Sequence, residues 1–360
     1  MSLHGASADL VERAIETADP LPGDRGFAGE LPGGKLVRDV LGRYPLFTER
    51  EGTGWAFSPT DLADPVSFPT GHVRDEGGLE RVWTLPEPEP TAEDGDAIEG
   101  LRDGLGESLD AIDTDGTAVA FSGGVDSAVV ASALSVPCYV AGFEGSHDLE
   151  AARSAADLLG LELVEIDVTH GEIERAAGRV ARATGRTNAM DVSIALTLFL
   201  VGERAAADGF DRLALGQGAD ELFGGYEKVA RLDHRVEAES VRGAAREAVS
   251  SLPHGLERDV LALRASGVEP VVPLLDDRLI EIALRLDGEH LVRDGVRKWA
   301  FREAARAFVP DEVTRRGKKA VQYGSLVSRE LDRLARQAGY KRRIDRHVDR
   351  YVESLLDSED

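Results

Sequence analysis

Three groups of residues have types and spacing suited to chemistry: a small-residue turn, an acidic turn and an isolated lysine, Lys298. The first, Ser122-Gly-Gly-Val-Asp-Ser127, follows the apolar run Thr117 to Phe121 and precedes the Ala-rich segment Ala128 to Leu134. This pattern predicts a strand, a tight turn and a helix. Glycines let backbone N–H groups approach a phosphate, and the helix N-terminus adds its positive dipole end. The stretch therefore predicts a phosphate site, although no Walker-type Gly-Lys-Ser/Thr follows it.

The second group is the acidic turn Leu215-Gly-Gln-Gly-Ala-Asp-Glu-Leu-Phe-Gly-Gly-Tyr226, which also follows a predicted strand. Loops at the carboxyl ends of parallel strands converge where the strand order reverses. We therefore expect Asp126 and Asp220 to face each other across a nucleotide, where two carboxylates would hold Mg²⁺. Capping of the helix that begins near Glu221 is a simpler role for Asp220, and the two roles are compatible.

The elements that must position these groups alternate from about residue 97 onward. Apolar runs predict strands at 117–121, 137–143, 162–166 and 211–215, and helical patterns predict helices at 98–112, 148–159, 172–184 and 193–208. Alternating strands and helices predict an α/β fold with a parallel sheet covered by helices on both faces. Beyond Glu227 the pattern is mostly helical.

Residues 1–90 have a different pattern, which predicts a small β-rich domain. A short helix at 7–17 precedes several turn signals, and β-like pieces follow at 44–48, 54–57 and 81–85. We expect Trp55 and Trp83 to lie in the core of this domain. The proline-rich acidic segment at 86–96 predicts a linker and the domain boundary.

Composition limits the kind of protein. The chain has 360 residues and a formal net charge of −24, and only six of its 42 basic residues are Lys. This balance favours solubility in high salt, as in halophilic proteins, and argues against nucleic acid as a partner. A single cysteine, Cys138, no apolar run of about 18 residues and no signal-peptide pattern predict a cytoplasmic protein with no membrane partner.

The two turns together resemble the synthetase domain of asparagine synthetases, which belong to the ATP-pyrophosphatase (PP-loop) group. Further stretches agree in order and spacing with that family: Gly267–Asp276, Lys298–Glu303 and Arg315–Ser325. The resemblance implies an adenine nucleotide alpha hydrolase-like fold over residues 97–350. It also implies that ATP activates a carboxylate as an acyl-adenylate, and that ammonia then displaces AMP to form an amide, as in asparagine biosynthesis.

The resemblance also implies roles for individual residues. Lys298 would neutralise phosphoryl and acyl oxygens, and Asp126 and Asp220 would hold Mg²⁺. Lys318 and Lys319 are further candidates, because retained lysines suggest a required point charge. The nucleotide-binding residues would be Ala120, Ser122, Gly123, Gly124, Val125, Asp126, Ser127, Ala141, Leu215 and Gly216.

Two positions depart from the family pattern. Gln217 stands where the family has Glu, and Gln can orient the nitrogen nucleophile but cannot accept its proton near neutral pH. Val271 stands where the family has Arg in the segment Gly267–Asp276. Both changes leave adenylation intact and leave open whether aspartate is the acid.

Residues 1–90 also resemble part of the family's glutaminase domain, notably at Leu36–Phe47. A glutaminase of this class needs an N-terminal cysteine nucleophile, but Ser2 follows Met1 here. We therefore expect a truncated domain without glutaminase activity, so that nitrogen would come from ammonia, a separate glutaminase or an amine.

Three alternatives stay open on the sequence alone: asparagine formation, adenylation of another carboxylate by a related synthetase, and a catalytically weakened nucleotide-binding regulator. A homodimer is compatible with all three.

Overall fold

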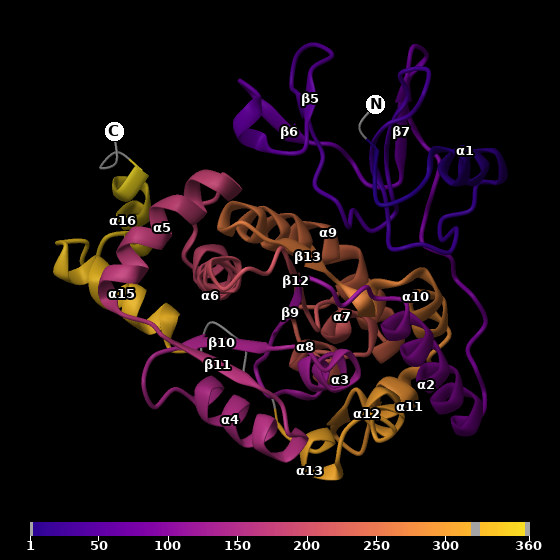
Figure 1. Cartoon of the computed structure of the whole chain (residues 1–360). Coiled ribbons are helices and arrows are strands. Elements are labelled where there is room, and N and C mark those ends of the chain that lie inside the picture. The colour runs from indigo at the N-terminus through magenta and orange to yellow at the C-terminus, as the bar shows by residue number, and fades with distance from the viewer. Residues whose placement is uncertain (1–2, 318–324, 357–360) are drawn as a thin grey trace.

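The computed structural model describes residues 3–317 and 325–356, and Lys318 and Lys319 lie outside this range. The chain forms an N-terminal antiparallel β region and a larger α/β region. In Figure 1 the N-terminal strands (indigo) lie above α9 (Val241–Ser266) and α10 (Asp277–Leu284), and the C-terminal helices (yellow) lie at the left of the view.

The N-terminal region contains two antiparallel sheets. Their orders are β1-β2-β3-β7-β8 and β5-β4-β6. The elements are β1 (Leu3–His4), α1 (Ala8–Thr17), β2 (Ala28–Glu30), β3 (Leu36–Arg38), β4 (Phe47–Glu49), β5 (Trp55–Ala56), η1 (Pro59–Asp61), β6 (Pro65–Ser67), β7 (His72–Asp75) and β8 (Gly78–Arg81). The predicted β-rich character and the helix at 7–17 are confirmed.

The core of this region forms around Trp83, which is buried and packs edge-on against Phe27 with ring centroids 5.3 Å apart. Trp55 is only half-buried. The predicted strand at 81–85 is wrong beyond Arg81, because the N–H groups of Val82 and Trp83 both bond to the carbonyl of Gly71 instead of continuing a ladder.

The predicted linker is extended but held against the larger region. Arg246 donates to the carbonyl of Pro86 at 2.8 Å, and Thr91 N–H donates to the carbonyl of Arg285 at 2.7 Å. These contacts satisfy one carbonyl and one N–H group of the linker that would otherwise need water, and they hold the linker against the larger region.

The larger region contains a five-stranded parallel sheet in the order β11-β10-β9-β12-β13. Its strands are β9 (Thr117–Ala120), β10 (Cys138–Gly142), β11 (Leu163–Asp167), β12 (Arg212–Ala214) and β13 (Glu269–Val271). The chain leaves β9 toward β10 and then returns to the other side at β12. The strand order therefore reverses between β9 and β12, and the two candidate turns emerge side by side.

Helices cover both faces of this sheet, because alternate strand residues belong to two separate cores. Val119, Val140 and Ala214 pack in one core with α3 (Val125–Leu134) and α4 (His147–Leu159). Ala118 and Tyr139, which point to the other face, pack in the second core with α5 (His170–Thr184) and α6 (Ala189–Ala207). Figure 1 shows α3 and α4 on one side of the sheet and α6 and α9 on the other. The predicted fold class is confirmed.

The helices of the larger region extend beyond the predicted four. They are α2 (Asp94–Asp110), α3 (Val125–Leu134), α4 (His147–Leu159), α5 (His170–Thr184), α6 (Ala189–Ala207), α7 (Ala219–Leu222), α8 (Glu227–Arg231), α9 (Val241–Ser266), η2 (Pro273–Leu275), α10 (Asp277–Leu284), α11 (Gly288–Leu291), α12 (Trp299–Ala305), α13 (Asp311–Thr314), α15 (Val327–Gln337) and α16 (His347–Leu356). Strands β14 (Val292–Arg293) and β15 (Val296–Arg297) form a hairpin before α12.

Candidate active site

The small-residue turn after β9 leaves the N-terminus of α3 open. Gly124 is its N-cap residue and provides no side-chain cap. Gly123 has φ +69°, and a Cβ there would clash with the carbonyl of Ala151. Ser127 Oγ accepts from Ser122 N–H at 3.2 Å, which folds the turn back onto the helix. The turn thus places uncapped backbone donors at the positive end of α3, an arrangement suited to a phosphate.

A cavity of about 350 Å³ opens on this turn. Its walls are the turn at 122–124, residues of α4 and Arg316. Arg316 donates to the carbonyl of Ala151 at 2.9 Å and to Ser154 Oγ at 2.7 Å, so its guanidinium is fixed against α4. Guanidinium groups bind phosphate oxygens well, and Arg316 is a functional candidate that our sequence analysis quoted within a stretch but did not single out.

A second cavity, of about 130 Å³, lies on the other side of Ser122. It is lined by Gln217 and by seven of the predicted nucleotide-binding residues: Ala120, Ser122, Asp126, Ser127, Ala141, Leu215 and Gly216. Gly216 permits the close packing of the two turns, because a Cβ there would lie 2.8 Å from Asp126 Cβ. The structure therefore brings these residues together, whereas Val125 is buried in the core and lines neither cavity.

Lys298 lies between the two predicted metal ligands. Its Nζ is 2.7 and 2.8 Å from the two oxygens of Asp126 and 2.6 Å from Asp220 Oδ1. Lys298 is 2% exposed and has φ +56°. A Cβ at Gly225 would clash with both Asp220 and the Lys298 side chain. Only glycine fits at that position, so the acidic turn can close over the lysine.

The acidic turn also carries a carboxyl group with a shifted pKa. Burial raises the pKa of Glu221, and the hydrogen bond from the Tyr226 hydroxyl at 2.6 Å opposes that shift. Asp220 adds a further raising influence, because a neighbouring carboxylate disfavours a second negative charge. Asp126 and Asp220 thus pair with the Lys298 ammonium, and the carboxyl group of Glu221 follows Asp220 in the same turn.

The carboxylates of Asp126 and Asp220 fit a Mg²⁺ ion shared with phosphate. Both pair with the Lys298 ammonium beside the turn at 122–127, so a bound ion would take the place of that contact. Mg²⁺ in phosphoryl-transfer sites takes one or two carboxylates and fills its remaining positions with phosphate oxygens and water. Asp126 and Asp220 would hold the ion, and the ion would neutralise the phosphates.

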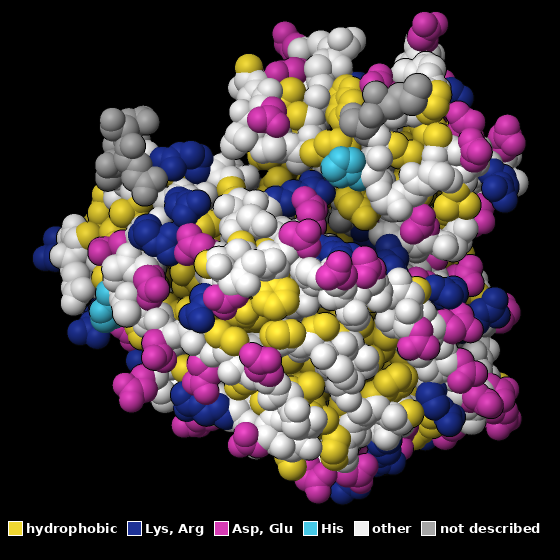
Figure 2. All heavy atoms as spheres, viewed as in Figure 1, with side chains coloured by type: hydrophobic (Ala, Val, Ile, Leu, Met, Phe, Trp, Pro, Cys, Tyr) yellow, Lys and Arg dark blue, Asp and Glu magenta, His cyan; other side chains and the backbone are white. Residues whose placement is uncertain are grey.

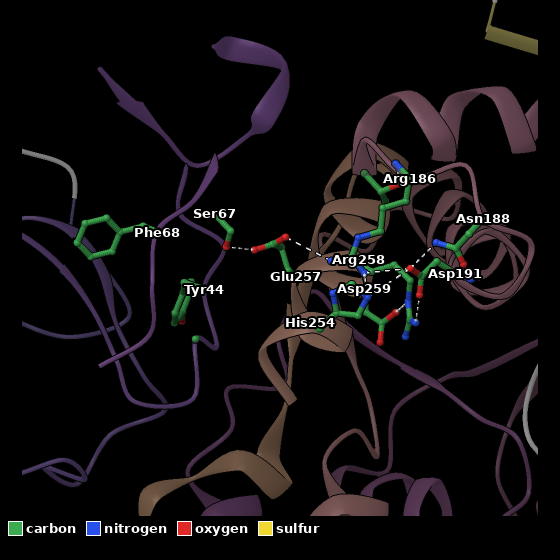
Figure 3. Close-up of polar contacts among 12 residues, drawn as sticks. Tyr44, Ser67, Phe68, Arg186, Asn188, Asp191, His254, Glu257, Arg258 and Asp259 are labelled. Atoms are coloured by element: carbon green, nitrogen blue, oxygen red, sulfur yellow. Dashed lines mark hydrogen bonds and ion pairs between the residues drawn. The ribbon is translucent and has the colours of Figure 1, made fainter. Parts of the chain in front are cut away.

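Gln217 is linked to a network that the sequence analysis did not find. Its Nε2 donates to Asp259 Oδ2 at 2.7 Å, and Asp259 is buried on α9. Figure 3 shows the network around Asp259, which continues through Arg258 to Asp191 on α6. No spacing or motif in the sequence connects residues 217 and 259, so only the packing of α9 over the turn reveals this contact.

The same network reaches the N-terminal region. Arg186 contacts both Asp191 and Glu257. Glu257 in turn accepts from Ser67 Oγ at 2.6 Å (Figure 3). It also pairs with the buried Arg38. Polar contacts therefore connect β6 with α9 and α6.

Two other positions discussed from the sequence line neither of these two cavities. Val271 lines a separate cavity of about 170 Å³ beside Arg43 and Arg264. Cys138 is buried in β10, and burial raises the pKa of its thiol to about 12. Such a thiol is inert at neutral pH, so the cysteine present is unsuited to act as a glutaminase nucleophile.

These features define a nucleotide-binding α/β protein of the PP-loop type. Residues 101–256 and 233–358 match the asparagine synthase family, and the chain therefore belongs to that family. Membership of this family implies the use of ATP.

Relatives agree with this assignment at low identity. A Methanocaldococcus jannaschii protein assigned as glutamine-hydrolysing asparagine synthetase 1 is 31% identical over 266 residues, which cover 63% of this chain and 49% of the relative. Glutamine-hydrolysing asparagine synthetase 2 of Oryza sativa is 27% identical over 80% of this chain and 54% of its own length. The chain thus spans about half the length of the curated relatives it matches.

Among solved structures, NMN synthetase from Francisella tularensis aligns with a TM-score of 0.34 and 12% identity, covering 74% of this chain and 94% of that one. This likeness is too weak to support an argument. Within residues 3–317 and 325–356, no helix has the length and apolar character needed to cross a membrane.

Proposed function

We propose that this protein is an ATP-dependent amide-forming ligase. It activates a carboxylate as an acyl-adenylate with release of pyrophosphate, and a nitrogen nucleophile then displaces AMP. The observation that carries the proposal is the position of Lys298, a buried ammonium held by Asp126 and Asp220 next to the turn at 122–127. A preorganised positive charge at that point stabilises the charge that develops on phosphoryl oxygens during adenylation.

Each group has a role in this reaction. Backbone donors of the turn at 122–127 and Arg316 bind the pyrophosphate. Asp126 and Asp220 would hold Mg²⁺, which would neutralise the phosphates, once the Lys298 ammonium leaves these carboxylates to contact the reacting phosphoryl oxygens. The adenosine occupies the cavity formed by Ala120, Ala141, Leu215 and Gly216. These side chains provide small apolar surfaces and backbone groups, which suit a planar base.

Aspartate is the first candidate for the acid, because the family relatives are asparagine synthetases. Gln217 and Val271 favour the second candidate, a related synthetase that acts on another carboxylate or amine, since both differ from the family pattern. Residues 1–90 form a truncated glutaminase-like domain in this proposal, and residues 97–350 form the synthetase domain. Nitrogen then comes from ammonia or from a separate glutaminase.

Isotope exchange between pyrophosphate and ATP tests the adenylation half-reaction directly. The purified protein is incubated with ATP, labelled pyrophosphate, Mg²⁺ and one of aspartate, glutamate, succinate or β-alanine, and transfer of label into ATP is measured. In a second reaction without added pyrophosphate, formation of AMP and amide is followed with ammonium or glutamine as nitrogen source. We expect acid-dependent exchange, and amide formation with ammonium but not with glutamine. Absence of exchange with every acid, despite ATP binding, would favour a regulatory nucleotide-binding protein.

Two lysine variants make this test specific. Lys298→Ala should lower the rate of exchange by about 10²–10³-fold, whereas Lys35→Ala removes an exposed lysine of the N-terminal region and should behave as the unaltered protein. Equal activity of the two variants would contradict the role of Lys298.

A further inference from the structure

The contact between Gln217 and Asp259 determines which way the Gln217 amide points. A carboxylate near neutral pH only accepts hydrogen bonds, so the group 2.7 Å from Asp259 Oδ2 must be the amide nitrogen. The Gln217 carbonyl oxygen therefore remains an acceptor for a ligand. Gln217 lines the cavity of about 130 Å³ that also contains Asp126 and Ser127.

Asp259 is itself held in one orientation. It is 4% exposed, and its other oxygen, Oδ1, accepts from Arg258 Nε at 2.7 Å. Arg258 also donates to Asp191 Oδ1 at 2.8 Å, and Asp191 accepts from Asn188 at 2.8 Å (Figure 3). Both oxygens of Asp259 are therefore committed, one to a buried guanidinium and one to Gln217.

The backbone on either side of Gln217 has little freedom. Gly218 has φ +88°, and a Cβ there would clash with Leu275. Gly216 packs against Asp126, as described above. Both glycines are closely packed by neighbouring groups, and the amide of Gln217 between them takes its orientation from its hydrogen-bond partner.

We propose that Asp259 is a positioning residue, which turns the carbonyl oxygen of Gln217 toward the cavity to accept a hydrogen bond from the N–H of the nitrogen nucleophile. This inference rests on the proposed function and identifies which group orients the nucleophile. It also explains why Gln suits this chain where the family pattern has Glu. Gln217 now donates an N–H···O hydrogen bond to Asp259. A Glu at position 217 would bring a second carboxylate against Asp259 instead, and like charges at that distance repel.

Substitutions at the two positions should each impair the enzyme and should compensate for each other when combined. In Asp259→Asn a single oxygen remains, and the charged Arg258 takes it as the stronger donor. The Asn amide nitrogen then faces Gln217, whose amide turns round and presents N–H groups to the cavity. In the double variant Gln217→Glu/Asp259→Asn, the Asn nitrogen donates to one oxygen of the glutamate, and the other oxygen is again an acceptor facing the cavity.

The experiment measures pyrophosphate exchange and amide formation in the unaltered protein, both single variants and the double variant, with ammonium chloride as the nucleophile and the acid that supports exchange. Losing one hydrogen bond of about 1.4 kcal/mol predicts a roughly tenfold higher KM for ammonium in Asp259→Asn. Gln217→Glu should also have a higher KM for ammonium, and the double variant should return most of the way to the KM of the unaltered protein. Thermal unfolding of all four proteins monitors folding.

A control on the same helix separates positioning from a general effect of removing a carboxylate. Glu247 accepts from the N–H of Ala238 at 2.6 Å and does not contact Gln217, so Glu247→Gln should keep the KM of the unaltered protein. A double variant no better than Gln217→Glu, or equal losses of exchange and amide formation in Asp259→Asn, would overturn the inference. Absence of exchange in the unaltered protein would instead overturn the proposed function, and the inference would fall with it.

Discussion

Lys298 and Asp126 are separated by 172 positions in the chain, yet the lysine ammonium lies 2.7 Å from one oxygen of Asp126 and 2.8 Å from the other. Asp220 approaches the same nitrogen to 2.6 Å. This three-residue contact joins the turn after β9, the turn after β12 and the start of α12. It is the structural basis of the proposed adenylation site.

Replacing Lys298 by Ala should lower the rate of pyrophosphate exchange by about 10²–10³-fold, as removal of a preorganised electrostatic group does in other enzymes. Lys298→Arg should retain part of the activity at most, because a planar guanidinium cannot reproduce the point charge between two carboxylates. Exchange kinetics at saturating Mg²⁺ check this prediction. A loss smaller than about threefold in Lys298→Ala would contradict it.

Replacing Gly123 by Ala should abolish ATP binding. Any side chain with a Cβ bears about 1–2 kcal/mol of left-handed backbone strain at φ +69°, and here it also clashes with the Ala151 carbonyl. Gly160 has φ +65° with no atom within 4 Å of an added Cβ, so Gly160→Ala bears the strain alone. Calorimetric titration with ATP should show binding by Gly160→Ala only. Similar affinities in both variants would argue against a phosphate role for the turn.

Replacing Arg43 by Met should destabilise the contact between the N-terminal β region and the larger α/β region. Arg43 is fully buried and pairs with Asp39 at 3.0 Å and with Asp277 at 2.6 Å. Breaking a buried ion pair costs about 3–5 kcal/mol of the free energy of unfolding. Arg50→Met, which removes an exposed pair with Asp64, should cost less than about 1 kcal/mol. Urea unfolding measures both, and equal costs would contradict the prediction.

The cost of Arg43→Met should also depend on pH. Burial raises the pKa of Asp277, and Arg43 opposes that shift. A carboxyl group with a raised pKa in the folded state contributes stability that is fully present below its unfolded pKa near 4 and is lost as the pH rises through the folded value. Without Arg43 the pKa of Asp277 in the folded state rises further. The loss of unfolding free energy caused by Arg43→Met should therefore be smallest in mild acid and should increase toward neutral pH. A cost that falls as pH rises would contradict this explanation.

The melting temperature should rise between about 0.1 M and about 1 M KCl, because salt at these concentrations screens repulsion among surface charges. The net charge of −24 makes this repulsion large. Figure 2 shows many acidic side chains on the face viewed, with basic ones scattered among them. Scanning calorimetry at several salt concentrations tests the prediction. A melting temperature that is flat or falls over this range would argue against adaptation to high salt.

Some structural features were predictable because their determinants are local. The strand, turn and helix around 117–134 follow from an apolar run, glycines and an Ala-rich segment. Strand β13 was missed because Glu269–Val271 contains only three residues and a proline, and its pairing with β12 at the sheet edge has no local signal. Arg316 was quoted only within a basic stretch, because the sequence does not show that α4 holds its guanidinium at the cavity.

The fold class, the family resemblance and the charged residues that follow the strands could be predicted from the sequence. Those properties depend on patterns within about 20 neighbouring residues, such as glycine conformation and strand–turn–helix order. The position of Lys298 between Asp126 and Asp220, and the contact of Asp259 with Gln217, are visible only in the folded chain. These contacts arise from the packing of α9 and α12 against the sheet, and distances across a packed core depend on the arrangement of many side chains together.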